Sequence, residues 1–329
     1  MRKWLFVAIS AALVSACSSD PAPPDPEVTA VPAPPRTRGV AVLSSDTNGD
    51  RLEFVDPEAG TITTTLSFPA TEDPLVTRYS PWEANEAFSP DWRYAAAHAG
   101  NDIQLYTLAD AEKRYVPARR ITPPSGADAI WSFRFGSTGS KLWFTTGVTP
   151  AAVYSVDYLV PDSAPVQEDA AFSHTWGLML DAQGKLVTES VHTTIAPDGK
   201  SWMYSVADKS GAVVNASLSM GSGNDYQLVA PPDGDALLFG ARSKPAGPAL
   251  IRVVRDQAAA TIRVTEIANS PQPVTSTVVS PDKTEAVFGT EGGPWFISST
   301  APGGTPRQVV VQGLPKDGNG TYHRLLGWA

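Results

Sequence analysis

The chain has 329 residues, a formal net charge of −9 and 42% hydrophobic residues. An acidic protein is a poor match for a polyanion, which argues against a nucleic-acid partner. The apolar content is ordinary for a globular protein, so the length suffices for one large all-β domain or two smaller domains. A single cysteine excludes an intramolecular disulfide.

The N-terminal residues indicate a signal peptide followed by a lipid attachment site. A basic start, Met1-Arg2-Lys3, precedes the apolar run 4–16, which is too short to span a bilayer but fits a signal peptide core. The run leads into Leu13-Val14-Ser15-Ala16-Cys17, which resembles the bacterial lipobox. We therefore predict a signal peptide over 1–16 and a diacylglycerol on Cys17. The alternative is a plain secretory signal with an incidental cysteine.

Residues 17–38 are predicted to form a lipidated, proline-rich stalk ahead of the folded domain, 39–329. Seven of the 21 residues from 18 to 38 are proline. Proline fixes φ and donates no backbone hydrogen bond, so this stretch is expected to stay extended and unpacked. Such a segment would hold the folded domain away from a membrane. A leader with no spacing role is the alternative.

A repeated phrase dominates residues 39–329: an apolar residue, a Pro-Asp turn and a second apolar run. Its copies are Phe88-Ser89-Pro90-Asp91, Ile195-Ala196-Pro197-Asp198-Gly199, Val229-Ala230-Pro231-Pro232-Asp233-Gly234 and Val279-Ser280-Pro281-Asp282, with a weaker copy at Phe135-Gly136-Ser137-Thr138-Gly139. The surrounding runs are short, rich in β-branched and aromatic residues, and separated by Gly, Pro, Asn and Asp. This pattern predicts strands and hairpins, not helices.

Repeating units of four short strands are typical of β-propeller blades. The Phe-Ser-Pro-Asp unit resembles the TolB-type propeller repeat, a relative of the WD-type repeat, and the segment 51–62 is similar to the repeat of surface-layer propellers. The resemblance covers 39–329 and implies an all-β propeller. It implies no particular function, because one fold hosts many functions.

The two ends of the domain predict how the propeller closes. The first unit has only three apolar runs, at 40–43, 51–55 and 61–66, and lacks the strand that should precede them. In the C-terminal segment 322–329, Trp328 stands where Phe88 stands in the second unit. We predict that this segment completes the first blade and closes a six-bladed ring. Inner strands are then expected near 84, 130, 193, 227, 275 and 322. A degraded seventh blade over 176–190 is the alternative.

No motif in the sequence predicts catalysis. A Gly-x-Ser-x-Gly elbow, a phosphate loop and a His-Glu-x-x-His motif are all missing. The histidines, His98, His174, His192 and His323, have no metal-ligand spacing. The run 46–50 resembles the start of a calcium loop, but Pro57 occupies the position of the bidentate glutamate, and we interpret the run as a polar turn. We expect no enzymatic activity, metal or cofactor.

A ligand is expected to dock where the inner strands begin, because loops on a rigid scaffold commonly carry binding residues. The candidates are the aromatic, acidic and imidazole side chains near those starts: Trp82, Glu83, Asp128, Trp131, Glu189, His192, Asp225, Tyr226 and His323. In the alternative interpretation the tryptophans fill blade interfaces and the charged residues are solvated loop residues.

The function expected from these features is that of a bacterial lipoprotein, anchored through Cys17 on the extracytoplasmic face of the cell membrane. Its propeller would act as a non-catalytic scaffold or recognition module for an envelope protein or peptide. One alternative is a lactonase- or hydrolase-like propeller enzyme, which needs carboxylates or histidines that converge in the channel. The other is a glycan- or solute-binding protein that uses the aromatic side chains.

Overall fold

Among the residues that the structure describes, strands follow one another with almost no other regular structure between them. The computed structural model describes residues 39–46, 49–69, 86–136, 138–147, 151–172, 190–195, 201–207, 218–222, 226–228, 236–241, 247–256, 261–290, 293–314 and 322–329. All of them belong to one compact unit, Pro34–Ala329. Apart from the short 3-10 helix η1 (Asp110–Glu112), every regular element in these ranges is a strand, so the predicted all-β class is confirmed. None of these ranges contains a helix of the length and apolarity that a membrane crossing requires.

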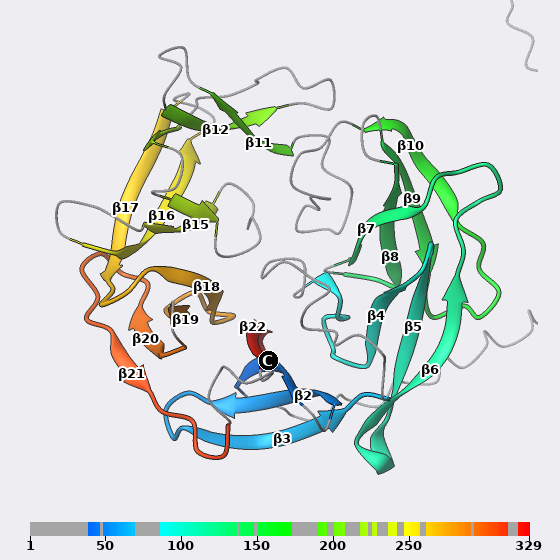
Figure 1. The fold of residues 1–329 in the computed structure, drawn as a ribbon, viewed down its shortest axis with the longest axis horizontal. Coiled ribbons are helices and arrows are strands. Elements are labelled where there is room, and N and C mark those ends of the chain that lie inside the picture. Colours follow the sequence, from blue (N-terminus) through cyan, green and yellow to red (C-terminus); the bar gives the residue numbers. More distant parts are fainter. Residues whose placement is uncertain are drawn as a thin grey trace, which may run out of the picture. The chain divides into compact units, whose positions relative to one another are not determined.

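The strands form successive antiparallel meanders, whose members lie side by side in Figure 1. The first has the order β22-β1-β2-β3 and is joined through a parallel β3–β6 pair to the second, so these two form one seven-stranded sheet. The other meanders are separate sheets with their strands in chain order. Their bounds are β1 (Val40–Asp46), β2 (Gly49–Asp56), β3 (Thr61–Ser67) and β22 (Tyr322–Trp328); β4 (Tyr94–Ala99), β5 (Asp102–Ala109) and β6 (Arg114–Ile121); β7 (Ile130–Phe135), β8 (Lys141–Thr146), β9 (Ala151–Asp157) and β10 (Val166–Phe172); β11 (Ser190–Ile195), β12 (Ser201–Ala207) and β13 (Leu218–Ser222); β14 (Tyr226–Leu228), β15 (Ala236–Ala241), β16 (Ala249–Asp256) and β17 (Thr261–Asn269); and β18 (Val274–Val279), β19 (Glu285–Thr290), β20 (Trp295–Ser299) and β21 (Arg307–Val309).

The first strands of these meanders begin within a few residues of the expected inner-strand starts. β7, β11, β14, β18 and β22 correspond to the starts expected near 130, 193, 227, 275 and 322. The start expected near 84 lies outside the described residues, and an isolated bridge between Phe88 and Ala95 occupies the first-strand position beside β4. The alternative seventh blade over 176–190 also falls almost wholly outside them. A repeated four-stranded antiparallel meander is the blade unit of β-propellers.

The Ser-Pro-Asp phrase forms the same turn in the second and the last meander. Ser89 Oγ donates to Asp91 Oδ1 at 2.6 Å and accepts from the Tyr94 backbone N–H at 2.9 Å. Ser280 Oγ likewise donates to Asp282 Oδ1 at 2.6 Å and accepts from the Glu285 backbone N–H at 3.0 Å. One serine hydroxyl therefore closes the turn and joins it to the next strand.

In the last meander these contacts also hold the aspartate ionised. The hydrogen bonds that Asp282 accepts, first from the Ser280 hydroxyl and then from Thr284, lower the pKa of its carboxyl group. The residue after the aspartate has a left-handed backbone, at φ 59° for Trp92 and 60° for Lys283. The weaker copy of the phrase places Gly139, at φ 73°, at the same position, where glycine carries no steric penalty.

Replacing the turn serine, which is buried, should therefore destabilise the fold. We expect Ser280→Ala to lower the free energy of unfolding by about 1–3 kcal/mol, because it removes the hydroxyl that accepts from the Glu285 backbone N–H and donates to Asp282, which then keeps only its hydrogen bonds from Thr284. Urea denaturation would measure the loss. The control is Ser125→Ala at an exposed turn, which should change stability by less than about 0.5 kcal/mol. Equal values for the two variants would contradict this role of the turn.

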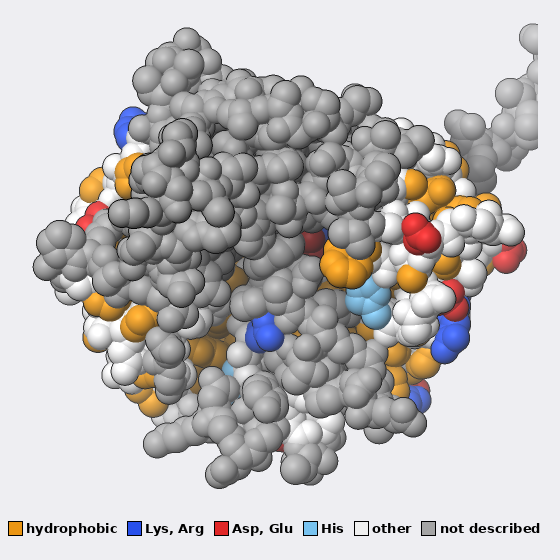
Figure 2. All heavy atoms as spheres, turned by 45° about the horizontal axis from the view of Figure 1, so that its top comes forward, with side chains coloured by type: hydrophobic (Ala, Val, Ile, Leu, Met, Phe, Trp, Pro, Cys, Tyr) orange, Lys and Arg blue, Asp and Glu red, His pale blue; other side chains and the backbone are white. Residues whose placement is uncertain are grey.

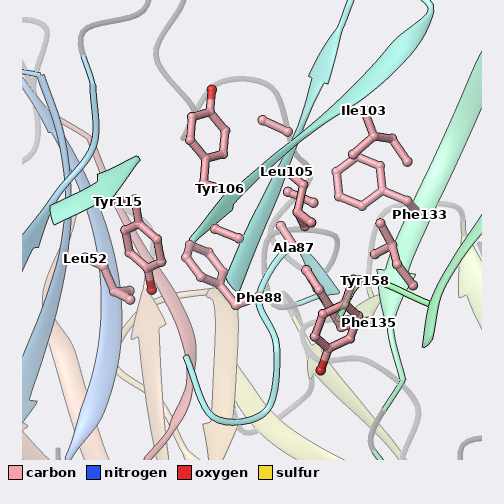
Figure 3. Packing of buried hydrophobic residues seen from close by; sticks show 14 of the residues in the cluster. Leu52, Ala87, Phe88, Ile103, Leu105, Tyr106, Tyr115, Phe133, Phe135 and Tyr158 are labelled. Carbon is pink, nitrogen blue, oxygen red and sulfur yellow. The ribbon is translucent and has the colours of Figure 1, made fainter. Parts of the chain in front are cut away.

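Aromatic side chains fill the space between the first and second meanders. Phe68 stacks on Tyr115 with ring centroids 4.4 Å apart, and Trp92 meets the edge of Phe54 at 5.6 Å. Figure 3 shows Phe88 and Tyr115 turned toward each other inside this cluster, which continues through β5 to β7. The buried Tyr115 hydroxyl donates to the Trp92 carbonyl at 2.6 Å, and burial raises its pKa. Apolar packing thus joins neighbouring meanders that share almost no backbone hydrogen bonds.

The C-terminal strand β22 pairs with β1 and presents one leucine to each side. It runs antiparallel to β1 from Tyr322 opposite Ser45 to Trp328 opposite Val40. Leu325 is buried with Val278 and Val287 of the last meander, while Leu326 belongs to the cluster of the first three meanders. Adjacent residues of a strand point to opposite faces, so β22 contributes to two separate cores.

Each of these leucines should be needed for stability. We expect Leu325→Ala and Leu326→Ala each to cost about 2–5 kcal/mol, because both side chains are buried and their loss leaves a cavity. Val310→Ala, at a side chain that is 69% exposed, serves as the matched control and should change stability by less than about 0.5 kcal/mol. Thermal and urea melts of the three variants make the comparison. If either leucine variant melts like the control, β22 does not pack as described.

Candidate functional site

The structure places some of the predicted ligand-face residues and leaves others outside its described ranges. The side chains of Asp128, Trp131 and His323 are described. The backbones of two more candidates lie near the starts of their strands, His192 in β11 and Tyr226 in β14. The remaining predicted residues, Trp82, Glu83, Glu189 and Asp225, lie outside the described residues, as does Cys17.

A β-bulge shapes the strand that carries Trp131. Ile130 pairs with Thr146 and Ser132 with Thr145, so Trp131 is the extra residue between two successive pairs. The indole is 57% exposed, whereas Ile130 is buried. A bulge re-aims a side chain and is common next to functional sites. Trp131 is therefore turned toward solvent by the backbone, at the predicted start of an inner strand.

The last meander repeats this bulge at the same offset. In β18, Val274 pairs with Thr290 and Ser276 with Gly289, which leaves Thr275 as the extra residue. Its hydroxyl donates to the Gly289 carbonyl at 3.3 Å. Thr275 was not among the predicted residues, because the bulge that distinguishes it depends on how β18 pairs with β19. Trp131, Thr275 and His323 all occupy that position, so equivalent ends of three meanders carry them.

Loops from two meanders meet beside Trp131. The Ile130 backbone N–H donates to the Asn101 carbonyl at 3.4 Å, which joins the β4–β5 turn to the start of β7. The rings of His98 and Phe133 lie 4.9 Å apart across the same junction. Figure 2 shows a histidine against hydrophobic side chains on the face turned forward. Asp128, in the loop that leads into β7, is exposed. This end of β7 thus combines an indole with a carboxylate.

His323 rests on a buried polar network that sequence reasoning did not foresee. Its Nδ1 lies 2.9 Å from Ser44 Oγ of β1, and the Ser44 hydroxyl donates to Glu53 of β2. A hydroxyl has one proton, so the serine must accept from His323. The neutral imidazole therefore carries its proton on Nδ1. Ser44 and Glu53 are both buried, at 0% and 4% exposure, so the network fixes the ring from beneath.

Arg51 extends this network along β2 and binds the Asp46 carboxylate of the 46–50 run. Its guanidinium binds Asp46 through two hydrogen bonds of 2.8 and 3.1 Å and lies 3.7 Å from Glu53. The hydrogen bonds to Asp46 raise the pKa of Arg51. Asp46 also faces Gly49 in the β1–β2 hairpin. These contacts support the interpretation of the run as a polar turn.

The order of groups in this network differs from that of a nucleophilic triad. In a triad the imidazole stands between the hydroxyl and the carboxylate, so that it removes the hydroxyl proton. Here Ser44 stands between His323 and Glu53, and its hydroxyl is inaccessible. Within the described ranges, no group of three or more His, Cys, Asp or Glu side chains is arranged to hold a metal ion. The arrangement is suited to holding His323 in one orientation.

Replacing Ser44 should free the His323 ring from this single orientation. We expect Ser44→Ala to cost about 1–3 kcal/mol of stability, because the buried Glu53 carboxylate and the partly buried His323 ring lose their shared partner. We also expect the His323 ring to shift from the Nδ1-protonated tautomer toward a mixture. Nitrogen NMR of the histidine rings measures the tautomer, and Thr65→Ala at an exposed strand position is the control. An Nε2-protonated ring in the unaltered protein would show that the hydrogen bond runs the other way.

Comparison with known proteins finds distant likenesses only. No protein-family model matches the chain, and no curated protein matches it. Among solved structures, it is similar to a β-propeller domain from Myceliophteria thermophila at 12% identity and a TM-score of 0.38, over 85% of this chain and 88% of that one. A functionally unknown protein from Desulfotomaculum acetoxidans is similar at 10% identity and a TM-score of 0.43, over 87% and 99%. A Lactobacillus plantarum protein is similar at 12% identity and a TM-score of 0.43, over 83% and 82%.

Proposed function

We propose that this protein is a six-bladed β-propeller of the TolB type that recognises an envelope protein or peptide without catalysing a reaction. The repeated four-stranded meanders and the shared Ser-Pro-Asp turn support the repeat type. The pairing of β22 with β1, together with its packing against β18–β21, supports ring closure by the C-terminal strand.

The observation that carries the recognition role is the bulge that exposes Trp131. Burying a large apolar side chain stabilises a protein by roughly 1.5–3 kcal/mol. The exposed Trp131 side chain contributes little of this free energy to the unbound protein, so the same free energy is available when a partner covers it. Tryptophan is enriched among the residues that dominate binding energies at interfaces. A rigid strand start is also a better platform than a free loop, because little conformational entropy is lost on binding. The first-strand ends, with Trp131, Thr275 and His323, form the proposed recognition face.

A non-catalytic role agrees with how the polar groups of this face are used. His323 and Glu53 bind one buried hydroxyl, and Arg51 binds Asp46, so these side chains satisfy one another. Buried polar networks of this kind rigidify a site. The proposed recognition face therefore needs no cofactor or metal, and nucleic acid is a poor partner for a chain of net charge −9.

Membrane attachment through Cys17 is the second part of the proposal. The lipobox-like run and the single cysteine support it, and the proline-rich segment would space the propeller from the bilayer. A diacylated cysteine supplies more than the single chain that gives only marginal binding. We expect Cys17→Ser to remove the lipid adduct from the intact mass and to move the protein into the soluble fraction. A lipid adduct on the variant would overturn this assignment.

The recognition role can be tested by placing a photo-crosslinking amino acid at Ala129, an exposed position two residues before Trp131, in cells of the source organism. We expect a discrete adduct with an envelope protein or peptide, because this position adjoins the proposed recognition face and leaves Trp131 in place. The same amino acid at Val310, which is 69% exposed, is the matched control and should give no such adduct. Identical adduct patterns at the two positions, or none at 129, would contradict the proposed recognition face.

A further inference from the structure

We infer that the ligand of the Trp131 face is a cationic peptide segment, bound through a lysine or arginine side chain over the indole and beside Asp128. The inference rests on the proposed function, since it specifies the chemistry of the same face. It draws on three observations: the exposure of Trp131, the exposed carboxylate of Asp128 three residues before it, and the net charge of the whole chain.

The first property is the exposed indole. The face of a tryptophan ring attracts a cation placed within about 6 Å of its centroid, and tryptophan does so most strongly of the aromatic side chains. The bulge at Trp131 leaves 57% of the residue accessible, and Ile130, beneath it, is anchored to Asn101. The ring is thus held at a fixed position where a ligand can reach it.

The second property is the carboxylate that precedes the strand. Asp128 is exposed and lies in the same short loop as the start of β7. The nearby Asp102 lies 3.8 Å from Arg120, so its charge is already partly compensated. A cation over the Trp131 ring could add an ion pair with Asp128. Exposed pairs of this kind are weak alone and contribute mainly to specificity and to the rate of association.

The third property is the net charge of −9, which attracts cations from a distance and repels anionic partners. It separates the cationic peptide from the main competitor, a neutral glycan, which also stacks on an exposed indole. A neutral glycan can donate its hydroxyls to Asp128 but gains nothing from the net charge of the chain. The two ligands therefore predict different responses to salt: the affinity of the cationic peptide falls as salt rises, and that of the glycan stays nearly constant.

The test uses the full-length protein in a nonionic detergent and titrates it calorimetrically with three hexapeptides. Each alternates glycine with lysine, glutamate or serine. We expect binding of the lysine peptide to exceed that of the other two by at least about tenfold at low salt, and to weaken as salt rises. A neutral chitin hexasaccharide is the fourth ligand. Equal binding of the three peptides, no binding of the lysine peptide at millimolar concentration, or tighter binding of the sugar would each overturn the inference.

Variants then assign the binding to this face. We expect Trp131→Ala to weaken the lysine peptide about tenfold, Trp131→Phe about threefold, and Asp128→Asn about threefold with a shallower salt dependence. Val310→Ala should bind like the unaltered protein. Thermal melts show that each variant is folded, and the exposed position of both side chains makes large losses of stability unexpected. Unchanged affinity in folded Trp131→Ala would overturn the inference.

Competition with the crosslinking experiment separates the two proposals. If the lysine peptide blocks the adduct formed at position 129, where Trp131 is retained, both stand. If an adduct forms and the lysine peptide does not reduce it while binding elsewhere, the cationic ligand is wrong and the recognition role survives. If the peptide binds at Trp131 and no envelope adduct forms, the chemistry of the face is supported and the proposed class of partner is overturned.

Discussion

Each meander of this protein must bury both of its faces, and most of the structure follows from that constraint. A four-stranded sheet with apolar residues on both sides is stable only between two neighbours. The first meander illustrates it: Leu43 and Leu326 pack toward the second meander, while Val42 and Leu325 pack toward the last. Neighbouring meanders are held by side-chain packing, because few backbone hydrogen bonds run between them. A single parallel pair, Ser67 with Arg114, joins β3 to β6.

The same constraint explains where polar chemistry can occur. The face of the first meander that carries Val42 and Leu325 continues, toward the end of β1, into Ser44 and its partners. A polar side chain in the packed space between two meanders must find a partner there, because unpaired buried polar groups are costly. The network of Ser44, Glu53 and His323 meets this requirement. Trp131 avoids this requirement in another way, because a bulge turns its side chain away from the space between the meanders and toward solvent.

The sequence predicts the strands well and the site only in part. Short apolar runs separated by Pro, Asp and Gly locate most strands, because turn chemistry is local. The repeated phrase likewise marks equivalent turns at Ser89 and Ser280. The candidate residue Trp131 follows from its place at a strand start. Its exposure does not follow, because a bulge depends on the register of two strands and leaves no mark in the residue pattern.

Long-range contacts account for the rest of what sequence reasoning missed. His323 and Ser44 lie at opposite ends of the domain and meet only because β22 pairs with β1. No pattern around either residue reveals that contact, and Glu53 had no feature that distinguished it from a solvated strand residue. Thr275 required knowledge that β7 and β18 share the same irregularity. Equivalent positions in a repeat become visible only when the repeats are aligned in space.

The pairing of β22 with β1 has a mechanical consequence. Gly39 and Ala329 exchange backbone hydrogen bonds of 3.2 and 2.8 Å, and β1 lies between β2 and β22. Tension that arrives from upstream of residue 39, as a tether would transmit it, therefore pulls on a strand with a partner on each side. Along the strand axis, such a force acts on both ladders in shear, so that many hydrogen bonds share the load at once. An edge strand in the same place would instead be peeled away one pair at a time.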